Sequence, residues 1–162
     1  MADPAQPQPS SEQNQPSFQI EKVYVKDLSL EIPHAPQVFV QQVQPQLEIQ
    51  IHTNAAQFSE GYYECSVTAT VTAKAGERTL FLAEVAQAGI FSVQGTTEET
   101  LQPVLAMHCP AMLFPYARQA IAHATMLAGF PPVQLQPINF EALYAQQLAG
   151  KAAEAGAPVA AA

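Results

Sequence analysis

A strict two-residue alternation over Tyr62–Ala73 constrains the fold of this chain more than any other feature. One parity is apolar or small, and the other holds the polar residues Glu64, Ser66, Thr68, Thr70 and Thr72. Because successive side chains of a strand point to opposite faces, the pattern predicts a strand with one buried and one solvated face. Residues 74–77 contain Gly76, which can adopt a positive φ, and predict a tight turn.

Three further segments predict strands. Residues 78–93 are apolar on both parities, which indicates a strand covered on both faces. Residues 47–53 alternate, and residues 18–32 place most of their apolar side chains, Tyr24 among them, on one parity. The proline-rich residues 32–45 predict an extended crossover loop. Four consecutive strands with short connections predict an antiparallel meander.

The second half of the chain has the 3.6-residue periodicity of helices. Thr97 is a candidate N-cap, with acidic residues directly after it. An apolar helix is predicted from Pro115 to Ala128, and Gly129 is expected to end it. Asn139 is predicted to cap a short amphipathic helix. Strands followed by helices indicate an α+β fold.

The two ends differ in composition from the middle of the chain. Residues 1–17 are rich in Pro, Gln and Ser, and residues 149–162 are rich in Ala and Gly. Both segments lack the apolar side chains that offset the entropy of ordering, so we expect a disordered N-terminal tail and a flexible C-terminal tail. Residues 18–148 are then expected to form one domain.

The chain carries few charges. Only 12% of its residues are charged, 48% are hydrophobic, and the formal net charge is −8. We therefore expect exposed apolar surface that is buried in an oligomer or binds a partner. The six basic residues are scattered, which argues against binding to nucleic acid or to anionic membranes. The sequence has no signal-peptide pattern and no apolar stretch of membrane-spanning length. It has two cysteines, too few for a disulfide framework, so a cytoplasmic protein with reduced thiols is expected.

The pair His108–Cys109 is the place where metal or thiol chemistry could occur. Zinc needs three or four ligands at recognisable spacings, and the remaining histidines and Cys65 do not supply them. A buried structural thiol is the favoured interpretation, and a catalytic cysteine near a helix start is the alternative. No catalytic triad, glycine-rich phosphate loop or carboxylate pair can be assigned, so we expect no catalytic residue, metal or cofactor, and no enzyme. A ligand-binding or enzymatic α+β domain is a competing hypothesis, which would need polar groups converging on an apolar pocket.

Four phrases occur in order on this layout of strands and helices: YVKDLSLEIPHAP, AGIFSV, CPAMLFPYAR and GFPPVQLQPINFEALY. Through them the chain resembles the SecB family of bacterial export chaperones over Phe18–Leu148. The resemblance implies a four-stranded antiparallel sheet with C-terminal helices packed on it, assembled as a tetramer, a dimer of dimers. It implies binding of unfolded precursor proteins in the cytosol and their delivery, still competent for translocation, to the SecA motor. A SecB-like chaperone dedicated to a toxin–antitoxin pair is the related alternative.

Three sets of site residues follow from the resemblance and the apolar pattern together. The acidic sheet face that would bind the basic C-terminal tail of SecA comprises Asp27, Glu31, Leu82 and Glu84, which explains the carboxylate of Glu84 in an apolar segment. The expected groove for unfolded clients is lined by Val38, Phe39, Val40 and Val43 in the crossover and by Phe140, Leu143 and Tyr144 in the last helix. The expected tetramer interface comprises Tyr116, Ala120, Ile121 and Ala124. Many members carry a tryptophan where this chain has Val43, so we expect a shallower or differently tuned groove.

Overall fold

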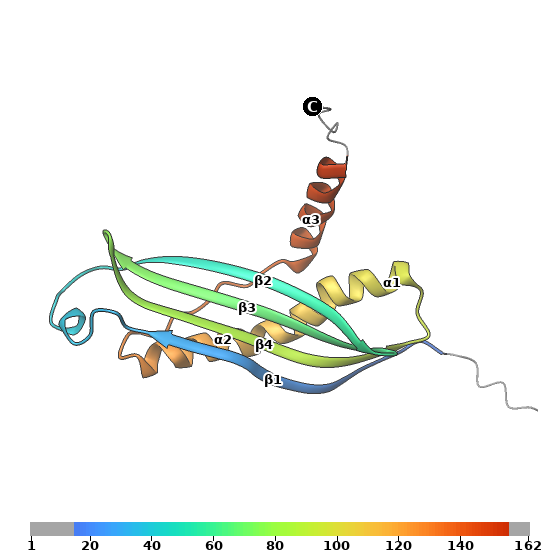
Figure 1. Ribbon diagram of the computed structural model, residues 1–162, viewed down its shortest axis with the longest axis horizontal. Coiled ribbons are helices and arrows are strands. Elements are labelled where there is room, and N and C mark those ends of the chain that lie inside the picture. Colours follow the sequence, from blue (N-terminus) through green and yellow to red (C-terminus); the bar gives the residue numbers. More distant parts are fainter. Residues whose placement is uncertain (1–14, 156–162) are drawn as a thin grey trace, which may run out of the picture.

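The computed structural model describes residues 15–155, arranged as one antiparallel sheet with helices on one of its faces (Figure 1). This arrangement is the α+β fold that the order of strands and helices predicts. Most of the two predicted tails, residues 1–14 and 156–162, lies outside the described residues.

The sheet consists of β1 (Ser17–Glu31), β2 (Gln46–Ser59), β3 (Tyr62–Ala75) and β4 (Arg78–Gln94). Their order across the sheet is β1-β4-β3-β2, and all neighbours pair antiparallel. The predicted meander is therefore correct for β2, β3 and β4 but wrong for β1, which lies beside β4. The most apolar strand, β4, lies between β1 and β3, so both of its edges are paired. Residues 32–45, with the short 3₁₀ helix η1 (Gln37–Phe39), carry the chain from one edge of the sheet to the other.

The two faces of the sheet differ as the alternation in β3 predicts. On one parity of β3, the side chains of Cys65, Val67, Ala69, Val71 and Ala73 are fully buried under the helices. The threonine parity is half-buried and belongs to the open face, which has no helix over it and is turned toward the viewer in Figure 1.

Two irregularities in β1 change which side chains share a face. The register with β4 shifts between Ile20 and Lys22 and again between Val25 and Asp27. Each extra residue in a bulge moves the following side chains to the other face. As a result Tyr24, which the parity predicts on the apolar face, lies on the open face with Asp27.

The long apolar helix begins earlier than the sequence predicts. The elements α1 (Glu98–Pro103), the π-helical turn η2 (Val104–His108) and α2 (Cys109–Leu127) form one uninterrupted helical run. Thr97 is the N-cap residue, as predicted, and Gly129 has a φ of 85°, which suits its predicted role in ending α2. Proline is expected to mark a helix start, but Pro115 lies inside α2.

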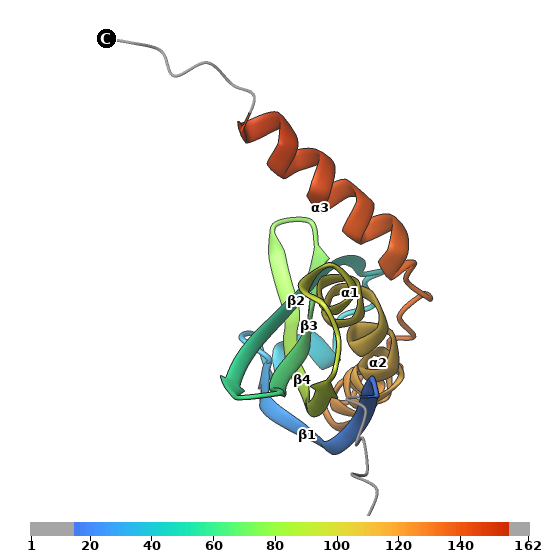
Figure 2. The same ribbon diagram turned by 90° about the vertical axis from the view of Figure 1, so that its right-hand side faces the viewer.

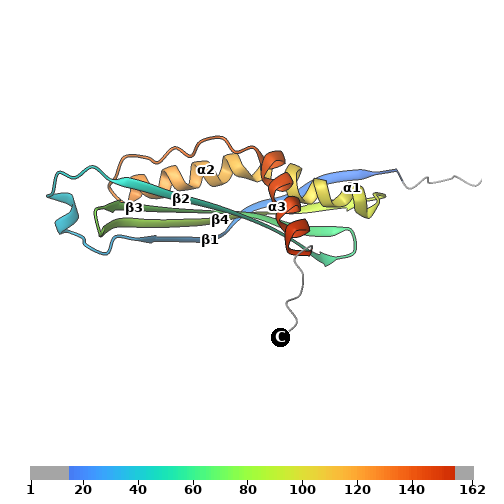
Figure 3. The same ribbon diagram turned by 90° about the horizontal axis from the view of Figure 1, so that it is seen from above.

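Helix α2 packs across the middle of the sheet, against β3 and β4. At Gly89 of β4, an added Cβ atom would lie only 2.9 Å from Cδ2 of Leu113, so glycine allows the close approach of helix and strand. Residues 128–139 then run back along α2, with Val133 and Leu135 buried (Figure 3).

The last helix, α3 (Phe140–Ala155), extends away from the sheet (Figure 2). The side chain of Asn139 caps it, accepting a 3.0 Å hydrogen bond from the backbone N–H of Ala142, as predicted. No helix in the described part of the chain is long and apolar enough to cross a membrane.

Candidate functional site

The thiols are placed for packing. The side chains of Cys65 and Cys109 are both fully buried, one on β3 and one at the start of α2. A hydrogen bond with Cys65, followed by burial, raises the pKa of Cys109, so its thiol stays protonated at neutral pH. A protonated thiol is neither a nucleophile nor a metal ligand. Within residues 15–155 no group of three or more His, Cys, Asp or Glu side chains could hold a metal ion.

The open face brings the predicted acidic residues together. Glu31 on β1 lies directly opposite Leu82 on β4, and Ser29 lies opposite Glu84 in the next row. Asp27 lies one row further, opposite Ala86. The predicted docking residues of β1 and β4 thus occupy three successive rows on one face. We call Asp27, Glu31, Leu82 and Glu84 the acidic patch.

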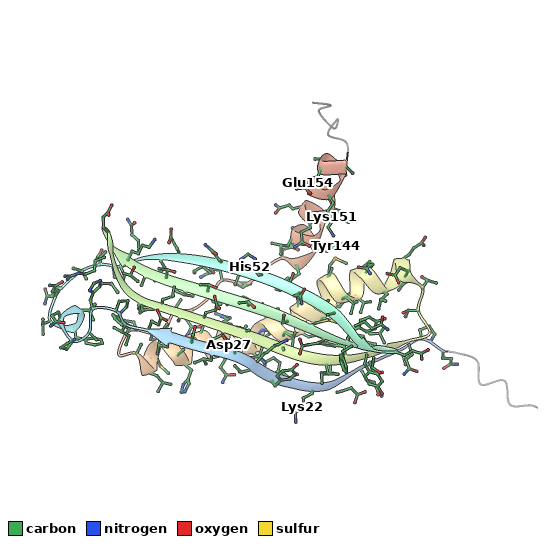
Figure 4. All side chains as sticks on the ribbon, viewed as in Figure 1. Lys22, Asp27, His52, Tyr144, Lys151 and Glu154 are labelled. Atoms are coloured by element: carbon green, nitrogen blue, oxygen red, sulfur yellow. The ribbon has the colours of Figure 1, made fainter. Side chains whose placement is uncertain are left out.

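The carboxylates of the acidic patch differ in their exposure. Asp27 and Glu31 are exposed on the edge strand, and Figure 4 shows Asp27 on this face with His52 on the opposite edge strand. Glu84 is half-buried, and its Oε2 accepts a 2.7 Å hydrogen bond from the Thr70 hydroxyl. The threonine face of β3 therefore supports the carboxylate, a role that the sequence pattern did not predict.

Other carboxylates of the open face are already paired. Glu64 accepts hydrogen bonds from the hydroxyl of Tyr24 and the ammonium of Lys26. The hydrogen bond from Lys26, followed by that from Tyr24, lowers the pKa of Glu64. The hydrogen bond to Glu64, together with burial and the charge of Glu64, raises the pKa of Tyr24 to about 12. Lys74 pairs with Glu48 at 2.9 Å. No ion pair in residues 15–155 involves the three acids of the acidic patch, so their charge is available to a partner.

The crossover presents three of its four predicted groove residues. Phe39, Val40 and Val43 are 50%, 84% and 42% exposed, whereas Val38 is 4% exposed. Val38 therefore packs in the core of this structure, which corrects its assignment to an accessible wall. The ring of Phe39 lies 5.4 Å from that of Phe130, and this contact fixes the crossover against the end of α2.

The edge strands carry exposed apolar side chains on the helix side of the sheet. Leu47 and Ile49 on β2 pair with Ala73 and Val71 and so point to the helix side, yet each remains 45% exposed. Helix α2 lies over β3 and β4, and its width leaves the edge strands uncovered. The pattern predicts the direction of such side chains, but the position of a strand at the sheet edge is a property of the whole fold.

The last helix contributes to a polar cleft. Phe140 is buried, with its ring 5.8 Å from that of Phe114, so it acts in the core and not as an accessible wall. Leu143 and Tyr144 are half-buried. Tyr144 lines a cleft of about 380 Å³ between α3, β2 and α1, with Asn54, Gln57, Glu98, Gln102, Gln147 and Lys151 among its other lining residues.

The residues predicted for the tetramer interface lie on two different sides of α2. Ile121 and Ala124 are 0% and 1% exposed and face the sheet, so they are not available to a second subunit. Tyr116 is 51% exposed and Ala120 is half-buried. The outer side of α2 is nevertheless apolar, and its exposed members include Met112, Tyr116, Met126 and Leu127.

Comparisons with known proteins agree over nearly the whole chain. A family model described as Preprotein translocase subunit SecB matches residues 11–151. Protein-export protein SecB of Methylobacillus flagellatus is 53% identical over 153 residues, covering 94% of this chain and 98% of its own length. That of Chromobacterium violaceum is 55% identical over 142 residues, covering 88% and 94%.

A solved structure shares the fold at low identity. It is the SecB-like chaperone of Mycobacterium tuberculosis in complex with a peptide from an antitoxin, with a TM-score of 0.57 and 20% sequence identity. The match covers 75% of this chain and 90% of that one.

Proposed function

This chain belongs to the SecB family of preprotein translocase subunits, and on that premise we propose that it binds unfolded preproteins in the cytoplasm, keeps them competent for translocation and passes them to SecA. The observation that carries the proposal is the apolar surface left uncovered on the edge strands and the crossover. A chaperone of unfolded chains needs such surface, and the net charge of −8 opposes its aggregation.

The client surface begins at the crossover and continues along β2. Phe39, Val40 and Val43 border it at one end, and Leu47 and Ile49 extend it along the strand. Because β2 is an edge strand, its outer backbone groups are free to pair with an extended client segment. The cleft beside Tyr144 offers amide and hydroxyl groups to the same segment further along.

The acidic patch is the docking surface for the basic C-terminal tail of SecA. Three carboxylates that form no ion pair with any residue from 15 to 155 lie in three successive rows of the sheet, and Leu82 lies in the end row, opposite Glu31. Basic side chains of the tail meet the carboxylates, and Leu82 supplies an apolar contact at one end of the patch. This surface is on the open face, so a client bound along β2 on the helix side does not block it.

The assembly is a tetramer, a dimer of dimers, with its helices enclosed between the sheets. The support for this arrangement is the apolar outer side of α2, which is exposed in a single subunit. Burying that side against other subunits removes the apolar surface that clients do not use.

A chaperone dedicated to a toxin–antitoxin pair is the weaker candidate. The relatives at 53–55% identity are named protein-export proteins, whereas the chaperone with an antitoxin peptide is 20% identical. This chain also keeps the acidic patch.

The test measures client holding and SecA binding on the same samples. Val40→Ser combined with Ile49→Ser should weaken the binding of an unfolded preprotein about tenfold and leave SecA binding unchanged. Gln50→Ser, on the open side of β2 next to Ile49, is the matched control. If the protein neither suppresses aggregation of the preprotein nor binds SecA, the proposed function is wrong.

A further inference from the structure

The crossover, residues 32–45, is held to the rest of the subunit by few contacts. It lies beyond the ends of the strands, beside the C-terminal end of α2 (Figures 1 and 3). Outside the strands, its backbone hydrogen bonds in the described structure all close within the segment, with Ala35, Val38, Phe39 and Val40 as donors. A segment with few contacts to its neighbours opens at a low cost in free energy. Side chains therefore hold the crossover in place.

Val38, Phe39 and Gln41 fasten the crossover to the rest of the subunit. Val38 is 4% exposed and belongs to the core, whereas the hydrogen bond that Gln41 accepts from Arg78 is exposed at the surface. Phe39 lies between these two and is 50% exposed, so its ring is covered on one side only. Val38 is a fixed anchor, and Phe39 can leave its site without opening the core.

The ring of Phe39 occupies a site that accommodates an aromatic ring. It lies 5.4 Å from the ring of Phe130, which lies 4.8 Å from the ring of the buried Phe81. At Gly129, an added Cβ atom would lie 3.2 Å from Cε1 of Phe39, so the missing side chain leaves room for the ring. Aromatic pairs at such separations attract each other beyond the gain from burial. We call Phe81, Gly129 and Phe130 the aromatic platform.

The aromatic platform adjoins the proposed client surface, because Phe39 and its neighbour Val40 border that surface. An aromatic side chain of a client fits the platform as the ring of Phe39 does, and the two rings cannot occupy it together. We propose that Phe39 is a displaceable plug, which covers the aromatic platform until an aromatic side chain of an unfolded client takes its place. This inference rests on the proposed client binding and adds to it a contact within the subunit that limits it.

The plug lowers the affinity of the unoccupied chaperone for every segment that needs the platform. A site that is open for only a fraction of the time has an apparent dissociation constant raised by the inverse of that fraction. An aromatic pair shifts the equilibrium between the covered and the open platform by a factor of about two to ten. Only a client side chain that restores the ring contact displaces Phe39 readily, so the plug favours aromatic over aliphatic segments.

The test uses two unfolded peptides, identical except that one phenylalanine of the first is alanine in the second. Phe39→Ala leaves the platform permanently open. By titration calorimetry, this variant should bind the phenylalanine peptide about fivefold more tightly than the unmodified protein does, and the alanine peptide with an affinity within about twofold. Val40→Ala shortens the adjacent side chain, which is 84% exposed, and is the matched control: it should tighten the binding of neither peptide.

A tryptophan at position 39 reports the movement of the plug. The chain has no tryptophan of its own, so the emission of Phe39→Trp comes from this position alone. Binding of the phenylalanine peptide should shift the emission to longer wavelength, because the ring leaves Phe130 for water. The alanine peptide should cause no such shift.

The outcomes separate this inference from the proposed function. An unmodified protein that binds neither peptide contradicts both. If the unmodified protein binds them and Phe39→Ala weakens both complexes, Phe39 is a wall of the client surface and the inference alone is wrong. An emission shift to shorter wavelength has the same meaning. If proteolysis shows that Phe39→Ala disorders the crossover, Phe39→Leu replaces it. That variant keeps an apolar side chain without a ring and should still tighten the binding of the phenylalanine peptide, by a smaller factor.

Discussion

Glu84 on β4 accepts a 2.7 Å hydrogen bond from the hydroxyl of Thr70, the residue directly opposite it on β3. The bond engages one carboxylate oxygen and leaves the other for a partner. It holds the side chain over the middle of the open face, between the edge-strand acids and the threonine face. The middle of the acidic patch therefore has a more fixed geometry than its exposed margin.

Charge reversal in the acidic patch should separate SecA binding from client binding. Glu84→Lys or Asp27→Lys should weaken binding of SecA by about 1 kcal/mol, roughly fivefold, and more strongly at low salt. Titration calorimetry against SecA and against an unfolded preprotein measures both effects. Thr70→Val is the control, because it removes the hydrogen bond to Glu84 but keeps the charge. It should change the affinity for SecA by less than about twofold. Equal losses of both binding activities would mean that the patch supports the fold.

Two alanines of α2 should respond differently to the same substitution. Ala124 is buried against the sheet, so Ala124→Glu should lower the free energy of unfolding by about 3 kcal/mol or more. Ala120 lines a cavity between α2 and β1 together with Val23, Val25, Tyr116 and His123. Ala120→Glu should leave the subunit folded and reduce the assembled mass. Urea unfolding and light scattering distinguish the two outcomes, and the interpretation fails if Ala120→Glu unfolds the subunit and Ala124→Glu does not.

These two alanines also show how far the sequence determines the site. An apolar helix with small residues on every side can be predicted, but which of its sides faces the sheet depends on the sheet itself. The sequence therefore places Ile121 and Ala124 at the interface between subunits, whereas the structure buries both against the sheet. In β3 the alternation is strict and the prediction is correct for every buried residue from Cys65 to Ala73.

Neither the order of the strands nor the position of the bulges could be predicted from the sequence, for a related reason. Pairing between β1 and β4 is a contact between distant segments, which no local periodicity encodes. A bulge adds one residue to one strand, and its position depends on the partner strand. The extra residue before Tyr24 moves its side chain from the face that the parity predicts to the open face. The polar parity of Asp27 and Glu31, the place of Glu84 in an apolar segment and the family resemblance together predict that these acids share a face, whereas the supporting bond from Thr70 required the register.

The cluster of Tyr24, Lys26 and Glu64 should affect stability at both ends of the pH range. The pKa of Tyr24 rises from 10.0 to about 12 on folding, so its contribution is fully present below pH 10 and is lost as the pH rises toward 12. The pKa of Glu64 is lowered from 4.5, so its contribution is present above that value and is lost as the pH falls through the lower, folded value. Each contribution is at most about 1 kcal/mol, because the cluster is partly exposed.

Single substitutions separate the loss of stability at alkaline pH from the loss at acid pH. Tyr24→Phe should remove the alkaline loss between about pH 10 and 12, and Glu64→Gln should remove both losses. Urea midpoints across the pH range measure these changes, with Tyr62→Phe as a tyrosine control. Identical alkaline profiles for Tyr24→Phe and the unmodified protein would contradict the role of this hydrogen bond.

The thiols should be unreactive and dispensable for client binding. Both side chains are fully buried and the pKa of Cys109 is raised, so Ellman's reagent should react only as the protein unfolds. Cys109→Ser should lower the free energy of unfolding by about 1–3 kcal/mol, because it buries a hydroxyl group, and Cys109→Ala should cost less. Client holding should stay unchanged in both variants. A folded Cys109→Ser variant that no longer holds clients would point to a chemical role for the thiol.

The position of β1 beside β4 also determines when the sheet can be completed during synthesis. Ser17 pairs with Gln94 and Glu31 with Leu82. The first strand to be synthesised, β1, therefore cannot pair until β4, the last strand, has left the ribosome. The three-stranded meander of β2, β3 and β4 can form from neighbouring segments, whereas pairing β1 with β4 must close a loop that contains β2 and β3. Until residue 94 has emerged, the nascent chain therefore exposes the apolar side chains of β1, and for that interval the chain is itself an unfolded protein with an uncovered strand.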